Sequence, residues 1–140
     1  MVRINLIKPK SLADQHLIAE YNEILMLLGH VNKFPVIENQ PKEYCLGKGH
    51  INFFKDKLKY LKERHEKIKK EMRKRGFVTN KNIDLNKFNI NLHKNWKPNK
   101  KDKEIIKKRL INKIKLKPEY YKYYSQNKPK KYFIELIKNG

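Results

Sequence analysis

An apolar stripe through residues 54–72 is the sequence feature that most limits what this chain can fold into. Successive members are separated by four, three, four, three and four residues, which places them on one face of an α-helix. The members are Phe54, Leu58, Leu61, His65, Ile68 and Met72. Lysines and arginines occupy the other faces. The stripe therefore predicts an amphipathic helix, and Gly76 followed by Phe77 predicts its C-terminal stop.

Another helix is predicted to begin near residue 12. Ser11 with Asp14 three positions later matches a capping box at its start. Gly29 is the expected stop, and Pro35 limits any extension. Apolar residues recur between these signals at helical spacing, namely Leu12, Leu17, Tyr21, Ile24 and Leu28. Residues 30–49 then read as a connecting loop that leads into the helix of the apolar stripe.

A third helix is predicted from a possible cap at Asn99 with Asp102 to a boundary at Pro118. Its expected buried face carries Ile106, Leu110 and Ile114. Residues 78–98 fit either a long loop or a short helical turn. The sequence therefore predicts an all-α fold, a single compact domain of three main helices with long connections.

The charge balance indicates the class of partner. The 140 residues include 35 Lys and Arg against 14 Asp and Glu, a formal net charge of +21. Such an excess costs self-repulsion and favours a polyanion such as nucleic acid. We expect no membrane span, because no apolar run approaches the ~20 residues required. We also expect no secretory signal, because the first residues lack the apolar region of such a signal. The single cysteine, Cys45, excludes a disulfide framework. An intracellular protein with access to DNA is expected.

The N-terminus offers one candidate nucleophile. Removal of the initiator Met would expose the α-amine of Val2, because a residue of that size permits processing. An α-amine has a pKa of ~7.7–8.0 against ~10.4 for lysine, so more of it is unprotonated at neutral pH. The neighbouring positive charge of Arg3 would lower that pKa further. The alternative is an ordinary, inert N-terminus.

Glu23 is a candidate catalytic carboxylate on the first predicted helix. It shares a face with polar or uncharged residues, which are Gln15, His16, Ala19, Asn22 and Met26. A carboxylate on the binding face of a cationic protein could stabilise a developing cation or move a proton. The alternative is a solvated helix residue without a catalytic role.

Two further groups are candidates for DNA contact. The segment 119–124 interleaves tyrosines with Lys122, so that rings could stack on bases while the ammonium meets a phosphate. Arg109 and Lys113 lie one helical turn apart, which suits two phosphate contacts. A core role for some tyrosines and a solvated basic face are the alternatives. The five histidines show no metal-ligand spacing, so no metal site is predicted.

Several short motifs follow one another along the chain. They are Arg3-Ile4-Asn5-Leu6, Leu12-Ala13-Asp14-Gln15-His16-Leu17, Ala19-Glu20-Tyr21, Glu23, Leu46-Gly47, Gly49-His50, Phe53-Phe54, Asp56-Lys57-Leu58, Leu61, Lys74-Arg75-Gly76-Phe77, Arg109-Leu110, Lys113-Ile114, Pro118 and Tyr121-Lys122-Tyr123-Tyr124. In their order and spacing these motifs resemble the pyrimidine-dimer DNA glycosylase/AP lyase family, which includes the phage-type ultraviolet endonuclease V. Residues 30–44 and 78–100 show little resemblance.

The resemblance implies a fold of three helices with the N-terminal segment threaded between them. It also implies a DNA repair enzyme in which the amine of Val2 attacks the sugar of the damaged nucleotide. The base leaves, an imine forms and β-elimination nicks the strand on the 3′ side. The expected substrate is double-stranded DNA that contains pyrimidine dimers or abasic sites, with the base opposite the lesion expelled. No cofactor is needed, and we expect a monomer.

Individual roles follow from the same resemblance. Val2 and Glu23 match the catalytic positions. The DNA-binding positions are matched by Arg3, Gln15, His16, Arg109, Lys113, Tyr120, Tyr121, Lys122 and Tyr123. The family often has arginine where this chain has Asn22 and Met26, and this departure implies either weaker phosphate contacts or a different lesion preference. Residues 1–124 would form the DNA glycosylase/AP lyase domain, and residues 125–140 a basic C-terminal tail.

Two alternatives stay open on the sequence alone. One is a basic helical module that binds nucleic acid without catalysis, in which Val2 and Glu23 are incidental. The other is an AP lyase without specificity for dimers.

Overall fold

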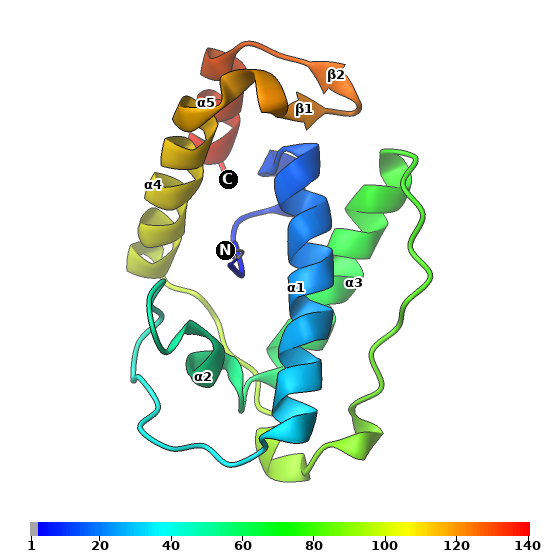
Figure 1. The fold of residues 1–140 in the computed structure, drawn as a ribbon, viewed down its shortest axis with the longest axis vertical. Coiled ribbons are helices and arrows are strands. Elements are labelled where there is room, and N and C mark those ends of the chain that lie inside the picture. The colour runs from blue at the N-terminus through cyan, green and yellow to red at the C-terminus, as the bar shows by residue number, and fades with distance from the viewer. Residues whose placement is uncertain (1–2) are drawn as a thin grey trace.

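The computed structural model describes residues 3–140, and five α-helices with four 3-10 turns make up most of that range (Figure 1). The predicted all-α fold is confirmed, and the three main helices are α1, α3 and α4. The helices are α1 (Asp14–Lys33), α2 (His50–Phe54), α3 (Leu58–Lys74), α4 (Lys100–Leu116) and α5 (Lys130–Lys138). The 3-10 turns are Pro9–Ser11, Leu85–Lys87, Ile90–Leu92 and Pro118–Tyr120. An antiparallel ribbon joins β1 (Lys122–Tyr123) to β2 (Gln126–Asn127).

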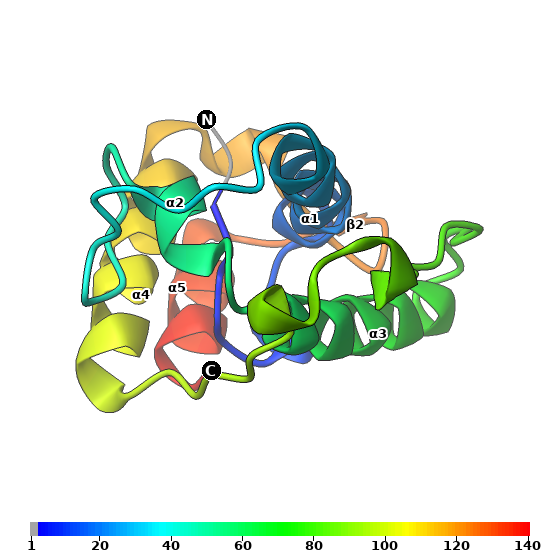
Figure 2. The ribbon, with the colours of Figure 1, turned by 90° about the horizontal axis from the view of Figure 1, so that it is seen from below.

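Four of the five helices form two pairs. Helices α1 and α3 pack along each other, and α5 packs on α4 (Figures 1 and 2). Phe133 and Ile137 of α5 are each 1% exposed and belong to the same apolar core as the other helices. The chain after residue 124 therefore contributes to the core. No helix of the described residues is long and apolar enough to cross a membrane.

The apolar stripe is buried as predicted, but it spans two helices. Phe54 closes α2, and Leu58 opens α3 after a break at residues 55–57. All six stripe residues are buried. The predicted stop is also confirmed, because Gly76 has φ +84° and Phe77 donates its N–H to the Met72 carbonyl at 2.9 Å.

Helix α1 differs from its prediction at its C-terminal end. Gly29 does not stop the helix, which continues to Lys33. The buried side chain of Val31 gives this last turn an apolar contact with the core, which outweighs the poor helix propensity of glycine. Pro35 follows the C-cap residue Phe34, so the limit set by the proline holds.

The predicted capping box at Ser11 and Asp14 is wrong. Ser11 belongs to a 3-10 turn, and the N-cap of α1 is Ala13, whose side chain makes no capping bond. The Asp14 carboxylate instead accepts hydrogen bonds from the backbone N–H groups of Tyr124 at 3.0 Å and Ser125 at 2.7 Å, and from Arg75 at 3.0 Å. Asp14 therefore joins the start of α1 to the end of α3 and to the ribbon turn.

Helix α4 begins as predicted. The Asn99 side chain accepts the Asp102 N–H at 2.8 Å, and the Asp102 carboxylate accepts the Asn99 N–H at 3.0 Å. Residues 78–98 contain two 3-10 turns within an irregular connection, which agrees with the short-turn alternative.

Residues 4–7, in the segment that precedes α1, are buried and held by hydrogen bonds from distant residues. Ile4 is 0% exposed; its carbonyl accepts the Tyr44 hydroxyl at 2.8 Å and its N–H is donated to His50 Nε2 at 3.1 Å. The Arg64 guanidinium donates to the Ile7 carbonyl at 2.6 Å. Glu20 accepts two further bonds from Arg64, at 2.8 Å and 3.0 Å. These contacts fix the chain that leads to the N-terminus.

Candidate functional site

An open cavity of about 300 Å³ lies between the N-terminal segment, α1, α4 and the turn after α4. It brings together most of the side chains that the sequence singled out for DNA contact. The lining residues are Arg3, Asn5, Gln15, His16, Ala19, Arg109, Lys113, Tyr120 and Tyr121.

Three cations surround this cavity. Arg109 and Lys113 lie one turn apart on α4, and Arg3 reaches the cavity from the N-terminal segment while its Nε donates to the Leu46 carbonyl. Partial burial and the positive charge of Arg3 lower the pKa of Arg109. Positive charge is therefore concentrated where hydration is incomplete, which is the setting that favours a phosphate.

His16 forms part of the cavity wall as a neutral imidazole. Its ring centroid lies 4.7 Å from that of Tyr121, at an interplanar angle of 40°. Burial, followed by the charges of Arg109 and Lys113, lowers the pKa of His16 to about 4. Its Nδ1 is buried and has no hydrogen-bond partner among the described residues. His16 therefore offers an unused polar atom at neutral pH.

Glu23 lies one helical turn beyond Ala19 on α1, beside the cavity, and is half-buried. Burial raises the pKa of its carboxyl group, although the positive charge of Arg3 acts in the opposite direction. A carboxylate with a raised pKa next to a cation can both stabilise positive charge and exchange a proton. This is the chemistry that the sequence analysis assigned to Glu23.

The tyrosines near the cavity differ in exposure. Tyr121 is 7% exposed and forms a wall, whereas Tyr120 is 60% exposed and meets the Tyr121 ring edge-on at 5.1 Å. A ring as open as that of Tyr120 is available to stack on a base. Gln15 supports this region, because its Oε1 accepts the backbone N–H of Lys122 at 2.9 Å.

Two of the predicted DNA contacts do not line the cavity. Lys122 is exposed on β1. The Tyr123 hydroxyl donates to the Lys10 carbonyl at 2.8 Å, and its ring lies 4.5 Å from the Arg75 guanidinium. Tyr123 thus packs against the end of α3. Val2 lies outside the described residues.

Asn5 was missed by sequence reasoning. It is 2% exposed, and its Oδ1 is buried without a hydrogen-bond partner among residues 3–140. A buried polar atom without a partner is costly, and this one belongs to a residue that lines the cavity. The signal was present in the sequence, since Asn5 interrupts an otherwise apolar run from Ile4 to Ile7.

The two positions at which the resemblance implies arginine are both on the surface of α1. Asn22 is exposed, and Met26 is 69% exposed. Among the described residues, no group of three His, Cys, Asp or Glu side chains could hold a metal ion.

The fold and the site define a small, strongly basic helical protein with a half-buried carboxylate beside a cationic cavity. The family model for pyrimidine dimer DNA glycosylase matches residues 1–85 of the chain. The match covers more than half of the 140 residues, and the chain belongs to this family of DNA repair enzymes. The matched range contains Arg3, Gln15, His16 and Glu23, whereas α4 and the ribbon lie beyond it.

Proposed function

We propose that this protein removes ultraviolet-induced pyrimidine dimers from double-stranded DNA and nicks the strand at the abasic site, with the α-amine of Val2 as nucleophile. The observation that carries the proposal is the position of Arg3. This residue directly follows the proposed nucleophile in the chain and lines the cavity with Arg109 and Lys113. Membership of the pyrimidine dimer glycosylase family supports the same substrate.

The proposed reaction uses a main-chain nitrogen. Its lone pair forms a bond to C1′ as the C1′–N glycosidic bond breaks, and the base leaves with the bonding electrons and takes up a proton. The nitrogen loses a proton, and its lone pair forms the imine to Val2 as the C1′–O4′ bond breaks. O4′ keeps the bonding electrons and takes up a proton, which opens the sugar ring. Loss of a C2′ proton then breaks the C3′–O bond and releases the 3′ phosphate. Water hydrolyses the imine and frees the amine.

Glu23 would stabilise positive charge on the sugar and on the protonated imine. Its raised pKa also suits transfer of the C2′ proton during elimination. Both the Val2 amine and the Glu23 carboxyl group must be unprotonated at the start, so activity should rise with pH through each pKa. In the pH profile of the cleavage rate, the limb that reports Glu23 should lie at higher pH than an ordinary glutamate would give.

The cavity residues would hold the damaged duplex. Arg3, Arg109 and Lys113 would contact phosphates, and Tyr120 would stack on a base that leaves the helix. We propose further DNA contacts for Gln15, His16, Tyr121, Lys122 and Tyr123. The protein would act as a monomer where DNA is accessible.

The test replaces Glu23 by Gln, with the exposed Glu104 replaced by Gln as the control. Single-turnover cleavage is measured on duplexes with one thymine dimer, one abasic site or neither. We expect Glu23→Gln to slow cleavage at least ~100-fold with binding retained, and Glu104→Gln to leave the rate unchanged. Unchanged cleavage by Glu23→Gln would refute the catalytic role. Cleavage by the unaltered protein of abasic DNA alone would reduce the activity to that of a lyase.

A further inference from the structure

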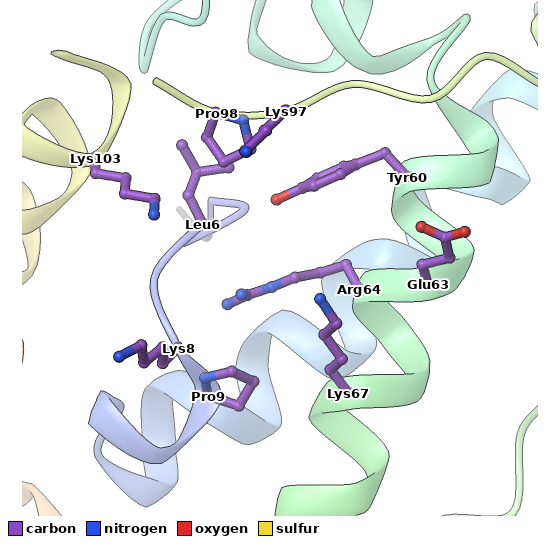
Figure 3. A pocket seen from close by; sticks show the side chains of 10 residues that line it. All are labelled: Leu6, Lys8, Pro9, Tyr60, Glu63, Arg64, Lys67, Lys97, Pro98 and Lys103. Carbon is purple, nitrogen blue, oxygen red and sulfur yellow. The ribbon is translucent and has the colours of Figure 1, made fainter. Parts of the chain in front are cut away.

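A second cavity, of about 270 Å³, lies between α3, the chain before Pro9 and the start of α4 (Figure 3). Four lysines reach it from different segments. They are Lys8 before the first turn, Lys67 on α3, Lys97 in the connection before α4, and Lys103 on α4. No residue lines both this cavity and the first cavity, which is the one lined by Arg3, Arg109 and Lys113.

The four ammonium groups are poorly neutralised. Within residues 3–140, none of them forms an ion pair with a carboxylate. Glu63 is the one acidic residue in the lining, and it is exposed. Arg64 also lines the cavity, but its charge is already neutralised by Glu20. Like charges that line one cavity repel one another, so an anion bound among them would relieve that repulsion.

The remaining lining residues add a hydrogen-bond donor and an apolar surface. In Figure 3 the Tyr60 side chain points into the cavity beside the Arg64 guanidinium. Burial raises the pKa of Tyr60 to about 12, so its hydroxyl keeps its proton at neutral pH. Leu6 and Pro98 supply apolar surface to the same lining. Charge attraction is stronger in such surroundings than on an open surface.

We propose that this cavity is a second phosphate-binding site, separate from the first cavity, in which Lys67 and Lys103 hold the anion and Tyr60 donates a hydrogen bond to it. The ligand chemistry is a phosphate group. Its source is either a free phosphate or the backbone of a second DNA segment. The inference rests on this cavity alone and does not depend on the proposed glycosylase mechanism.

The first experiment titrates the protein with inorganic phosphate at constant ionic strength and follows backbone amide shifts by NMR. We compare Lys67→Gln/Lys103→Gln with Lys62→Gln/Lys115→Gln, which removes the same charge from exposed positions that line neither cavity. We expect saturable shifts around Tyr60, a dissociation constant at least tenfold weaker in the first double variant, and less than a twofold change in the second.

Glu63→Gln should have the opposite effect on phosphate affinity. It removes the negative charge at the cavity and should tighten phosphate binding about twofold or more. Glu104→Gln is its control. Equal weakening in the two lysine double variants would show binding by net charge alone and overturn the proposal. Shifts that do not saturate, or that leave the Tyr60 region unchanged, would also overturn it.

A second experiment identifies the source of the phosphate. An immobilised undamaged duplex is loaded with protein, and capture of a second, fluorescent duplex is measured. Loss of capture in Lys67→Gln/Lys103→Gln, with capture retained in Lys62→Gln/Lys115→Gln, would assign the cavity to the backbone of a second DNA segment. Saturable phosphate binding with equal capture by both variants would assign it to free phosphate.

Discussion

Arg64 and Arg109 are both at least partly buried, yet their surroundings shift the pKa of the guanidinium in opposite directions. Burial acts to lower the pKa of Arg64, but the Glu20 carboxylate outweighs it, and the pKa is raised. The pKa of Arg109 is lowered by burial and by the positive charge of Arg3. Arg64 joins α3 to α1 and to the Ile7 carbonyl, whereas Arg109 faces an open cavity.

The difference between Arg64 and Arg109 shows where this chain places its few carboxylates. Glu20, Glu71 and Asp14 neutralise buried arginines, namely Arg64 and Arg75, and so support the fold. The cations Arg3, Arg109 and Lys113 line the first cavity together, and an anionic ligand would offset their mutual repulsion. Stability and DNA binding should therefore respond to different substitutions.

The largest effect is expected for Glu20→Gln. It leaves the Arg64 guanidinium, with a side chain only 5% exposed, without its negative partner. We expect a loss of ~3–5 kcal/mol in the free energy of unfolding, measured by denaturant titration. The control is Glu43→Gln, because the Glu43 side chain is 73% exposed in its pair with Lys101 and should matter little. Equal losses would remove the distinction between buried and surface pairs.

A smaller effect, and on binding instead of stability, is expected for Arg109→Gln. Loss of one phosphate contact should weaken DNA affinity and reduce the slope of log K against log salt by about 1. The free energy of unfolding should change by less than ~1 kcal/mol, because the substitution also relieves repulsion with Arg3. Lys115→Gln, on another face of α4, is the control. An unchanged salt slope would place Arg109 outside the DNA interface.

The smallest effect is a shift in a single titration. NMR should show His16 titrating near pH 4, as burial and the neighbouring charges lower its pKa from 6.5 to about 4. The unfolded chain then binds the extra proton first, so this histidine's contribution to stability is full above pH 6.5 and declines as the pH falls toward 4. Lys113→Gln should raise the pKa by a fraction of a unit, because burial is the larger cause. A His16 pKa near 6.5 would contradict the buried, cationic setting.

Local sequence signals predicted those parts of the fold that depend on neighbours along the chain. The cap formed by Asn99 and Asp102 is confirmed because both partners lie within one turn. The cap predicted at Ser11 and Asp14 failed because the partners of Asp14 lie far away in sequence, on Arg75 and in the ribbon turn. Spacing alone cannot reveal such competitors.

The candidate site shows the same limit. Helical spacing correctly placed Arg109 and Lys113 on one face of α4. The tyrosine pattern did not distinguish Tyr121, which lines the cavity, from Tyr123, which packs on Arg75. The different positions of Tyr121 and Tyr123 depend on the ribbon turn, where Tyr124 and Ser125 both have positive φ values. Neither residue type predicts this conformation.

Borohydride trapping tests the central claim most directly. The mature protein, with Val2 confirmed as first residue by mass, is reacted with duplexes that carry one thymine dimer, one abasic site or neither. We expect a covalent protein–DNA product on the dimer duplex and on the abasic duplex, lost when the α-amine is blocked by acetylation. No trapped product on either damaged duplex, or a product that survives acetylation, would contradict an imine formed by the Val2 amine.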